Sequence, residues 1–237
     1  SPLKFVFDLL KLLIPLLIVA VWIKLRPPPL LPTLVILLGS LLWVLTTVKS
    51  GSLTSYGLSF WGAHGHDALF HLSLIESFKR SLWPLHNPNL VGTLIQNYHI
   101  LYDYLLALLS RFLHISSLEL YFRFIPPLMA LSIGWLSFIL MRRWRFSPAA
   151  STLSLLALYL TGSLGFIPHW FKTGSPWGGE AIFWTQQNIS TLINPPYALS
   201  LVILLAFLNL FSSWHKKITS VSLITLSLLA ALLIQTK

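Results

Sequence analysis

The sequence contains no cysteine and very little charge. Its 237 residues include six acidic and sixteen basic side chains, so 9% are charged, against roughly 25% in an ordinary soluble domain. The absence of cysteine excludes thiol catalysis, disulfides and cysteine-ligated zinc. Because 55% of the residues are apolar, the chain is neither disordered nor able to cover a water-exposed surface with polar groups. These features predict an all-α, polytopic membrane protein.

Apolar runs recur along the chain at about the 20-residue length that crosses the hydrocarbon core of a bilayer. The clean runs are Leu30–Val48, Leu118–Leu140, Pro148–Ile167, Leu192–Phe211 and Ile218–Ile234. A further run, Phe5–Ile23, contains Asp8 and Lys11, so it is either a span or an interfacial helix. We therefore predict about five to six transmembrane helices.

Positive charge gathers between the apolar runs. The net charge of +10 would favour nucleic acid in a soluble chain, but in a membrane protein basic residues between spans set orientation, so we expect no nucleic-acid partner. The basic clusters are Lys24 with Arg26, Arg142 with Arg143 and Arg145, and Lys216 with Lys217. By the positive-inside rule these connections are cytoplasmic, and the stretches 49–117 and 168–191 lie outside.

This orientation predicts one membrane domain over residues 1–237. Gly and Pro occur at short breaks between apolar runs rather than in linkers, so the sequence predicts no domain boundary. Its predicted parts are N-terminal helices at 5–48, an external loop at 49–117, and four transmembrane helices over 118–237 with a second external loop at 168–191.

Two segments of the first external loop are predicted to be helices that lie on the membrane surface, near 67–80 and 96–115. The first is too short to span a bilayer. The second carries Asp103 and Arg111, which are costly at mid-membrane. A crossing there would also move the arginines at 142–145 to the outside.

The sharpest polar cluster is His64-Gly65-His66-Asp67, followed one helical turn later by His71. Asp67 stands where an N-cap residue would satisfy the first free amides of a helix. Its functional alternative is a general base, with His66 and His71 as substrate-binding neighbours. His64, His66 and Asp67 are also candidate ligands of a divalent cation, although no established metal-ligand spacing is present.

A second polar group opens the segment near 96–115. His99 and Asp103 are four residues apart, so they share one face of a helix, and Tyr98 lies beside them. The alternatives are an interfacial aromatic belt with one ion pair, and a polar wall that binds substrate.

The loop at 168–191 contains two further candidate substrate-binding residues. Lys172 would neutralise a lipid phosphate or act as an ordinary interfacial anchor. Glu180 lies among tryptophans, which suit sugar rings and membrane surfaces equally. Because the predicted spans contain no chain of charges across the bilayer, we rank an ion-coupled transporter last.

The order of these parts resembles the GT-C superfamily of membrane glycosyltransferases. Residues 67–77 look like the first-loop helix of that superfamily, which begins with its catalytic acidic residue, and residues 87–110 are similar to uncharacterised prokaryotic members. Family members usually have more spans, so we expect the chain to be a fragment or a minimal form. Many also carry a second acidic residue beside the catalytic one, where this chain has His66 and Ala68.

The resemblance implies a function. A sugar would be transferred with inversion from a polyprenyl-phosphate donor to an acceptor on the outer, periplasmic face of a prokaryotic plasma (inner) membrane, with Asp67 taking the proton of the acceptor hydroxyl. A basic group or a divalent cation would steady the departing phosphate. The alternative is a non-catalytic carrier or assembly subunit for lipid-linked sugars.

Overall fold

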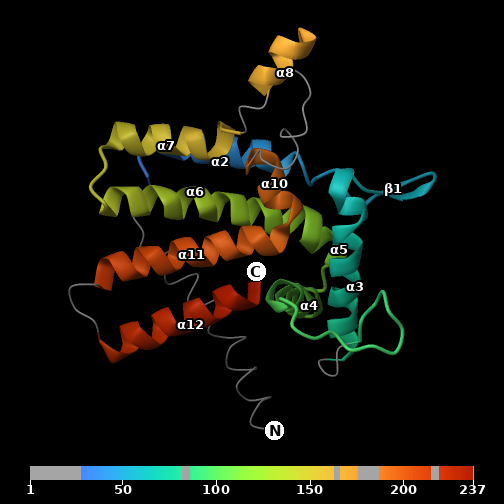
Figure 1. Cartoon of the computed structure of the whole chain (residues 1–237). Helices are drawn as coiled ribbons and strands as arrows, with labels where there is room; N and C mark the ends of the chain where they lie inside the picture. The colour runs from blue at the N-terminus through green and yellow to red at the C-terminus, as the bar shows by residue number, and fades with distance from the viewer. Residues whose placement is uncertain (1–27, 82–85, 163–165, 176–186, 215–218, 237) are drawn as a thin grey trace.

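The computed structural model describes residues 28–81, 86–162, 166–175, 187–214 and 219–236, and it is mostly helical, at 73%. Apolar helices lie side by side in a bundle, and two shorter helices lie across one end of it (Figure 1). The all-α class is thereby confirmed. The candidate span Phe5–Ile23 lies outside the described residues.

The bundle is built around α6 (Ile125–Arg143). This helix packs against α2, α7 and α11, and α11 in turn packs against α12. The bounds of these four are α2 (Leu30–Val44), α7 (Pro148–Leu160), α11 (Pro195–Trp214) and α12 (Ser220–Thr236). Each clean apolar run of the sequence therefore gives one helix of the bundle.

Among the residues that the structure describes, two helical segments are long and apolar enough to cross a membrane, namely Ser117–Arg143 with 27 residues and Pro195–Trp214 with 20. Of the other helices of the bundle, α2 and α7 are shorter than predicted. The helix expected to reach Ile167 ends at Leu160, because Thr161 adopts an extended conformation. Ser117–Arg143 joins α5 (Ser117–Glu119), the π-helical turn η2 (Leu120–Phe124) and α6. Prolines at the second and third positions of α6 lack the N–H of a regular helical turn, and the π-helical turn directly precedes them.

The two helices across the end of the bundle are α3 (Asp67–Arg80) and α4 (Leu101–Leu113) (Figure 1). The bounds of α3 agree with the predicted helix at 67–80. The helix predicted at 96–115 is shorter at both ends, because Asn97 and His114 both have positive φ values, of 54° and 56°. Both helices bury residues at three- and four-residue intervals, and these faces contact each other.

The remaining elements are short. A hairpin of β1 (Ser52–Thr54) and β2 (Gly57–Ser59) pairs antiparallel and precedes the 3₁₀ turn η1 (Gly62–Gly65). The sequence predicted two helices in this loop and no hairpin, because strands of three residues are too short to show alternation. The other helices are α8 (Phe166–Thr173) and α10 (Gln187–Ile193).

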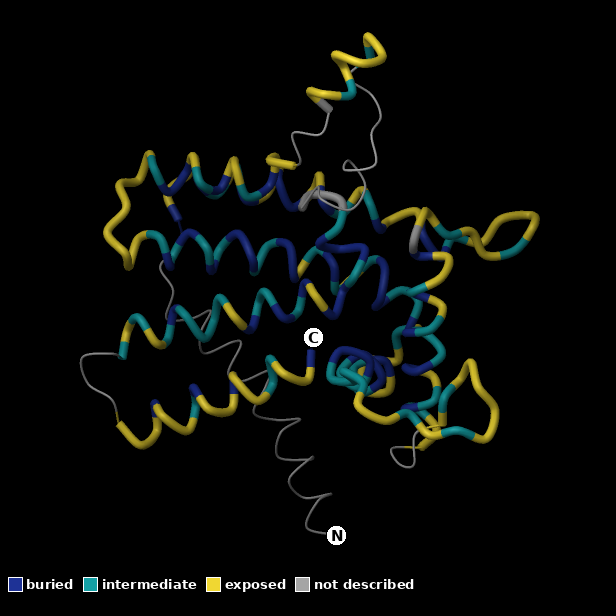
Figure 2. The backbone as a smooth tube through the Cα atoms, viewed as in Figure 1, coloured by how far each residue is buried: buried dark blue, intermediate teal, exposed yellow. Residues whose placement is uncertain are grey.

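Burial follows this division of the molecule. Figure 2 shows buried residues along α6 and exposed residues along much of α12. Buried residues also lie on α3 and α4, and much of α2 is exposed. Many of these exposed residues are large and apolar. On α2 they include Leu31 at 63%, Leu38 at 61% and Leu41 at 57%, and on α12 they include Val221 at 72% and Ile234 at 75%.

The side chain of Tyr159 connects three helices of the bundle. From α7, its hydroxyl donates to the carbonyl of Ala130 on α6 at 2.8 Å and lies 3.1 Å from the hydroxyl of Ser40 on α2. The indole N–H of Trp43 donates to the Tyr159 carbonyl at 3.1 Å. Gly134 leaves the space for this ring, because a Cβ there would lie 2.0 Å from the phenolic oxygen.

We predict that Gly134→Ala destabilises the bundle by about 1–3 kcal/mol, the usual cost of overpacking a filled core. The measurement is the thermal unfolding midpoint of the purified chain. Ser132→Ala on the same helix is the control, because the Ser132 hydroxyl bonds only its own helix, at the carbonyl of Leu128. Equal midpoints for the two variants would contradict the role of Tyr159.

Candidate functional site

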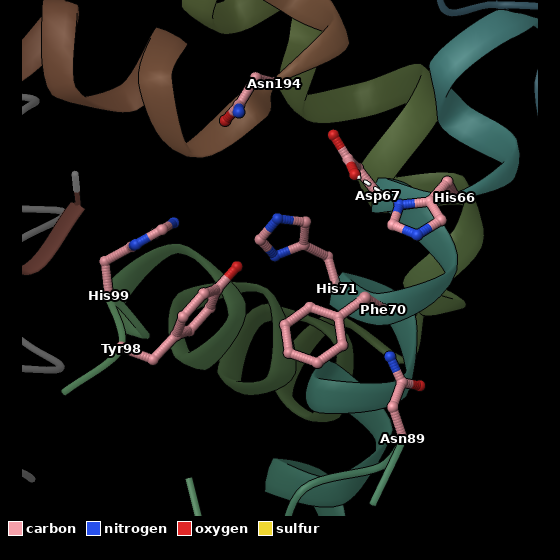
Figure 3. Close-up of a pocket in the computed structure, with 8 residues that line it drawn as sticks. All are labelled: His66, Asp67, Phe70, His71, Asn89, Tyr98, His99 and Asn194. Atoms are coloured by element: carbon pink, nitrogen blue, oxygen red, sulfur yellow. Dashed lines mark hydrogen bonds and ion pairs between the residues drawn. The ribbon is translucent and has the colours of Figure 1, made fainter. Parts of the chain in front are cut away.

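A cavity of about 360 Å³ lies where α3, the loop before α4 and the start of α11 meet. Its volume falls within the range of about 300–1,000 Å³ that small-molecule sites occupy. Its lining combines one carboxylate with imidazole, phenol, amide and phenyl groups (Figure 3). The residues are His66, Asp67, Phe70, His71, Asn89, Tyr98, His99 and Asn194. Five of them were singled out in the sequence, and the fold brings all five to one place.

Asp67 is the first residue of α3, and its side chain is 45% exposed. Its Oδ1 atom accepts a hydrogen bond from Nδ1 of His66 at 2.9 Å. The predicted N-cap role is wrong, because His66 occupies the cap position and no side chain caps this helix. The carboxylate instead points to the side of the cavity where Asn194 lies (Figure 3). Because Asp67 is at the N-terminus of α3, the positive end of the helix dipole stabilises its negative charge.

His71 and Asp103 form a buried pair between α3 and α4. The Nδ1 atom of His71 lies 3.0 Å from both carboxylate oxygens of Asp103, and the two side chains are 6% and 0% exposed. The sequence predicted a pairing of Asp103 with His99, whereas the structure pairs it with His71, 32 residues away. Burial raises the pKa of Asp103, and the hydrogen bond from His71 opposes that shift.

This pairing fixes the orientation of the imidazole. An ionised carboxylate only accepts hydrogen bonds, so the proton on Nδ1 of His71 is donated to Asp103. The other ring nitrogen, Nε2, is turned toward the side of the cavity where Asp67 and Asn194 lie (Figure 3). The cavity therefore contains a half-exposed carboxylate and a carboxylate-bound imidazole, one helical turn apart on α3.

Aromatic rings form the wall beside His71. The ring of Tyr98 meets Phe70 edge-on at 5.4 Å and stacks on His99 at 4.2 Å. Burial, with smaller contributions from the charges of Asp103 and Asp67, raises the pKa of Tyr98 to about 12. Tyr98 is therefore a phenol at neutral pH and can both donate and accept a hydrogen bond in the cavity.

His64 has a different role from the other histidines of its cluster. It is fully buried, and the hydroxyl of Ser50, which accepts from the backbone N–H of Trp61, donates to Nδ1 of His64 at 2.7 Å. Burial lowers the pKa of His64 to about 4, although the backbone of Leu192 and the charge of Asp67 act in the opposite direction. His64 is thus a neutral core residue.

No cation site is assembled from these groups. Across the ranges that the structure describes, no three His, Cys, Asp or Glu side chains converge in a way that could hold a metal ion. His64 is directed to Ser50, whereas the side chain of His66 is 95% exposed and bonds Asp67. The residues present therefore do not form the divalent-cation site that the sequence raised as an option.

The two candidates from the loop at 168–191 are not part of the cavity. Lys172 lies on α8, which stands apart from α3 and α4 (Figure 1), and it does not line the cavity. Glu180 lies outside the described residues. Asn194 lines the cavity although it was not predicted as a site residue. The sequence feature that could have indicated it is Asn-Pro-Pro at the start of α11. In the structure the Oδ1 atom of Asn194 accepts a hydrogen bond from the backbone N–H of Tyr197 at 3.3 Å.

We predict that acid weakens the folded chain through His64. Its folded pKa of about 4 lies below the ordinary value of 6.5, so between these values the unfolded chain binds a proton that the folded chain does not. Stability is therefore complete above about pH 6.5 and falls by up to about 3 kcal/mol as pH drops to 4. The measurement is the free energy of unfolding against pH.

The controls for this pH dependence are two histidine variants. His64→Gln should flatten the decline, whereas His66→Gln should keep it, because the His66 side chain is 95% exposed. An unchanged decline in His64→Gln would show that the acid sensitivity lies elsewhere.

Comparison with known proteins found no match for this chain. No protein-family model, no curated protein and no solved structure matches it. A function for the chain is therefore argued from the geometry of the cavity and from the sequence patterns.

Proposed function

We propose that the chain is a membrane glycosyltransferase of the GT-C kind, which transfers a sugar from a polyprenyl-phosphate donor to an acceptor hydroxyl with inversion. The observation that carries this proposal is the carboxylate of Asp67, which faces a cavity lined by aromatic and amide side chains at one end of the apolar bundle. A carboxylate in that position can take a proton from a hydroxyl group.

The exposed surface of the bundle supports a membrane location. Soluble proteins rarely expose large contiguous apolar patches, yet α2 and α12 carry many exposed leucine, isoleucine and valine side chains. We assign α2, α6 with its preceding turns, α7, α11 and α12 to the bilayer. The helices α3 and α4, which run across the end of the bundle, then lie at the interface between lipid and water.

The basic residues support an external cavity. Arg142 and Arg143 end α6, and Arg145 follows in the turn before α7, at the end of the bundle opposite to α3 and α4 (Figure 1). By the positive-inside rule this arginine-rich end is cytoplasmic. The cavity then opens on the periplasmic face of a prokaryotic plasma (inner) membrane.

The side chains of the cavity suit a sugar. Phe70 and Tyr98 offer aromatic faces to the apolar side of a sugar ring, and the amides of Asn89 and Asn194 offer donors and acceptors to its hydroxyl groups. In the transfer, the acceptor oxygen bonds to the anomeric carbon while the bond from that carbon to the phosphate oxygen breaks. Asp67 takes the proton of the acceptor hydroxyl, and the lipid phosphate leaves with the electron pair.

We predict that Asp67→Asn lowers kcat by about 10²–10⁴-fold, the usual contribution of a general base, while KM for the donor changes little. The measurement is release of sugar from a polyprenyl-phosphate donor by the chain, within its complete protein, in liposomes. Glu119→Gln is the control, because Glu119 forms a half-exposed ion pair with Arg123 at 2.9 Å, away from the cavity.

Two outcomes would contradict the proposal. Equal turnover by Asp67→Asn and wild type would assign the base to another residue. Binding of the donor by wild type without release of sugar would favour the alternative function, a carrier or assembly subunit for lipid-linked sugars.

A further inference from the structure

The described residues place no lysine or arginine in the cavity. Two basic side chains of neighbouring elements have other partners, since Lys79 bonds Glu76 at 2.9 Å and Arg123 pairs with Glu119 at 2.9 Å. Yet a phosphate-linked substrate brings negative charge to a cavity that already contains the carboxylate of Asp67. Within the described part of the chain, the groups at the cavity that can carry positive charge are therefore imidazoles.

Of the three histidines that line the cavity, His71 is the best placed to bind a negatively charged phosphate. His66 is almost fully exposed and bonds Asp67, and His99 stacks on Tyr98 at the edge of the cavity. His71 is 94% removed from solvent and held at Nδ1 by both oxygens of Asp103. A buried carboxylate at Nδ1 stabilises the protonated ring, as in catalytic Asp–His pairs.

We infer that His71, held by Asp103, binds the phosphate of the lipid-linked donor through a hydrogen bond from Nε2–H. This inference rests on the proposed glycosyl transfer. It states which part of the substrates lies at each end of the cavity. Asp67 is the base for the acceptor, His71 holds the leaving phosphate, and Asp103 is a positioning residue that acts through His71.

The spacing of the two groups suits an inverting displacement. Residues four apart on a helix place their Cβ atoms about 5–6 Å from each other, so Asp67 and His71 can flank one anomeric carbon. The attacking oxygen then approaches from the side of Asp67, and the bond that breaks points to His71. On transfer the phosphodiester becomes a phosphomonoester with one more negative charge, and a cationic imidazole stabilises that increase.

The test is binding of farnesyl phosphate, which carries no sugar, to the full chain in nanodiscs. His71→Gln should bind about tenfold more weakly than wild type, since a hydrogen bond to a charged group is worth roughly that factor or more. Asp103→Asn should also weaken binding, because the His71 ring loses the carboxylate that orients Nε2 toward the cavity.

Control variants separate this site from general effects. His114→Asn should behave as wild type, because His114 is exposed at the opposite end of α4 from Asp103 and already has the left-handed conformation that Asn tolerates. Asp67→Asn should still bind farnesyl phosphate. If Asp67→Asn loses sugar transfer but still binds farnesyl phosphate, the defect lies in the proposed base and the phosphate site is intact.

A measurement on wild type avoids any dependence on the folding of a variant. In ¹⁵N spectra of histidine-labelled protein, farnesyl phosphate should shift the Nε2 resonance of His71 more than its Nδ1 resonance. Inorganic phosphate should compete at much higher concentration, because it lacks the lipid chain. Equal potency of the two phosphates, unaltered affinity in His71→Gln, or an unshifted Nε2 resonance would each overturn the assignment.

Discussion

The hydrogen bond between His71 and Asp103 determines the geometry of the cavity. A fully buried carboxylate needs a partner, because an uncompensated charge in a protein interior costs several kcal/mol. Asp103 on α4 finds that partner on α3, so the two helices across the end of the bundle hold one relative position. Asp67, one turn before His71, is placed by the same contact.

The rest of the chain supports this end of the molecule. The bundle of α2, α6 and α7 is fixed by the bonds that meet at Tyr159, and its outer surfaces are apolar. All four acidic side chains among the described residues lie on α3, α4 and α5, at the end that carries the cavity. Although only 9% of the residues are charged, the carboxylates in the described part of the chain therefore lie together at the end of the bundle formed by α3 and α4.

Local patterns in the sequence predicted much of the fold. The apolar runs gave the helices of the bundle, and the spacing of apolar residues after Asp67 gave the bounds of α3, because both signals depend on neighbours three to four residues apart. The ends of helices were less predictable. The extended conformation of Thr161 ends α7 early, and the positive φ values of Asn97 and His114 shorten α4.

The candidate site was predictable in its members but not in its contacts. Asp67, His71 and Asp103 stand out as polar residues in an apolar chain, yet the bond between His71 and Asp103 joins residues 32 positions apart. Helical spacing could suggest only the nearer histidine, His99, as a partner. The burial of His64 was likewise hidden, because it depends on Ser50 from the preceding loop and on packing against Phe122.

The central claim is that the cavity opens outside a membrane while the arginine-rich turn before α7 lies inside. The absence of cysteine makes this directly measurable, because a single introduced thiol has no background. The sites are Tyr56, which is 100% exposed in the hairpin near the cavity end, and Phe146, which is 45% exposed at the opposite end. In intact cells, a membrane-impermeant maleimide should label Tyr56→Cys and spare Phe146→Cys. Protection of Tyr56→Cys together with labelling of Phe146→Cys would reverse the orientation, and equal labelling of both would contradict the membrane location.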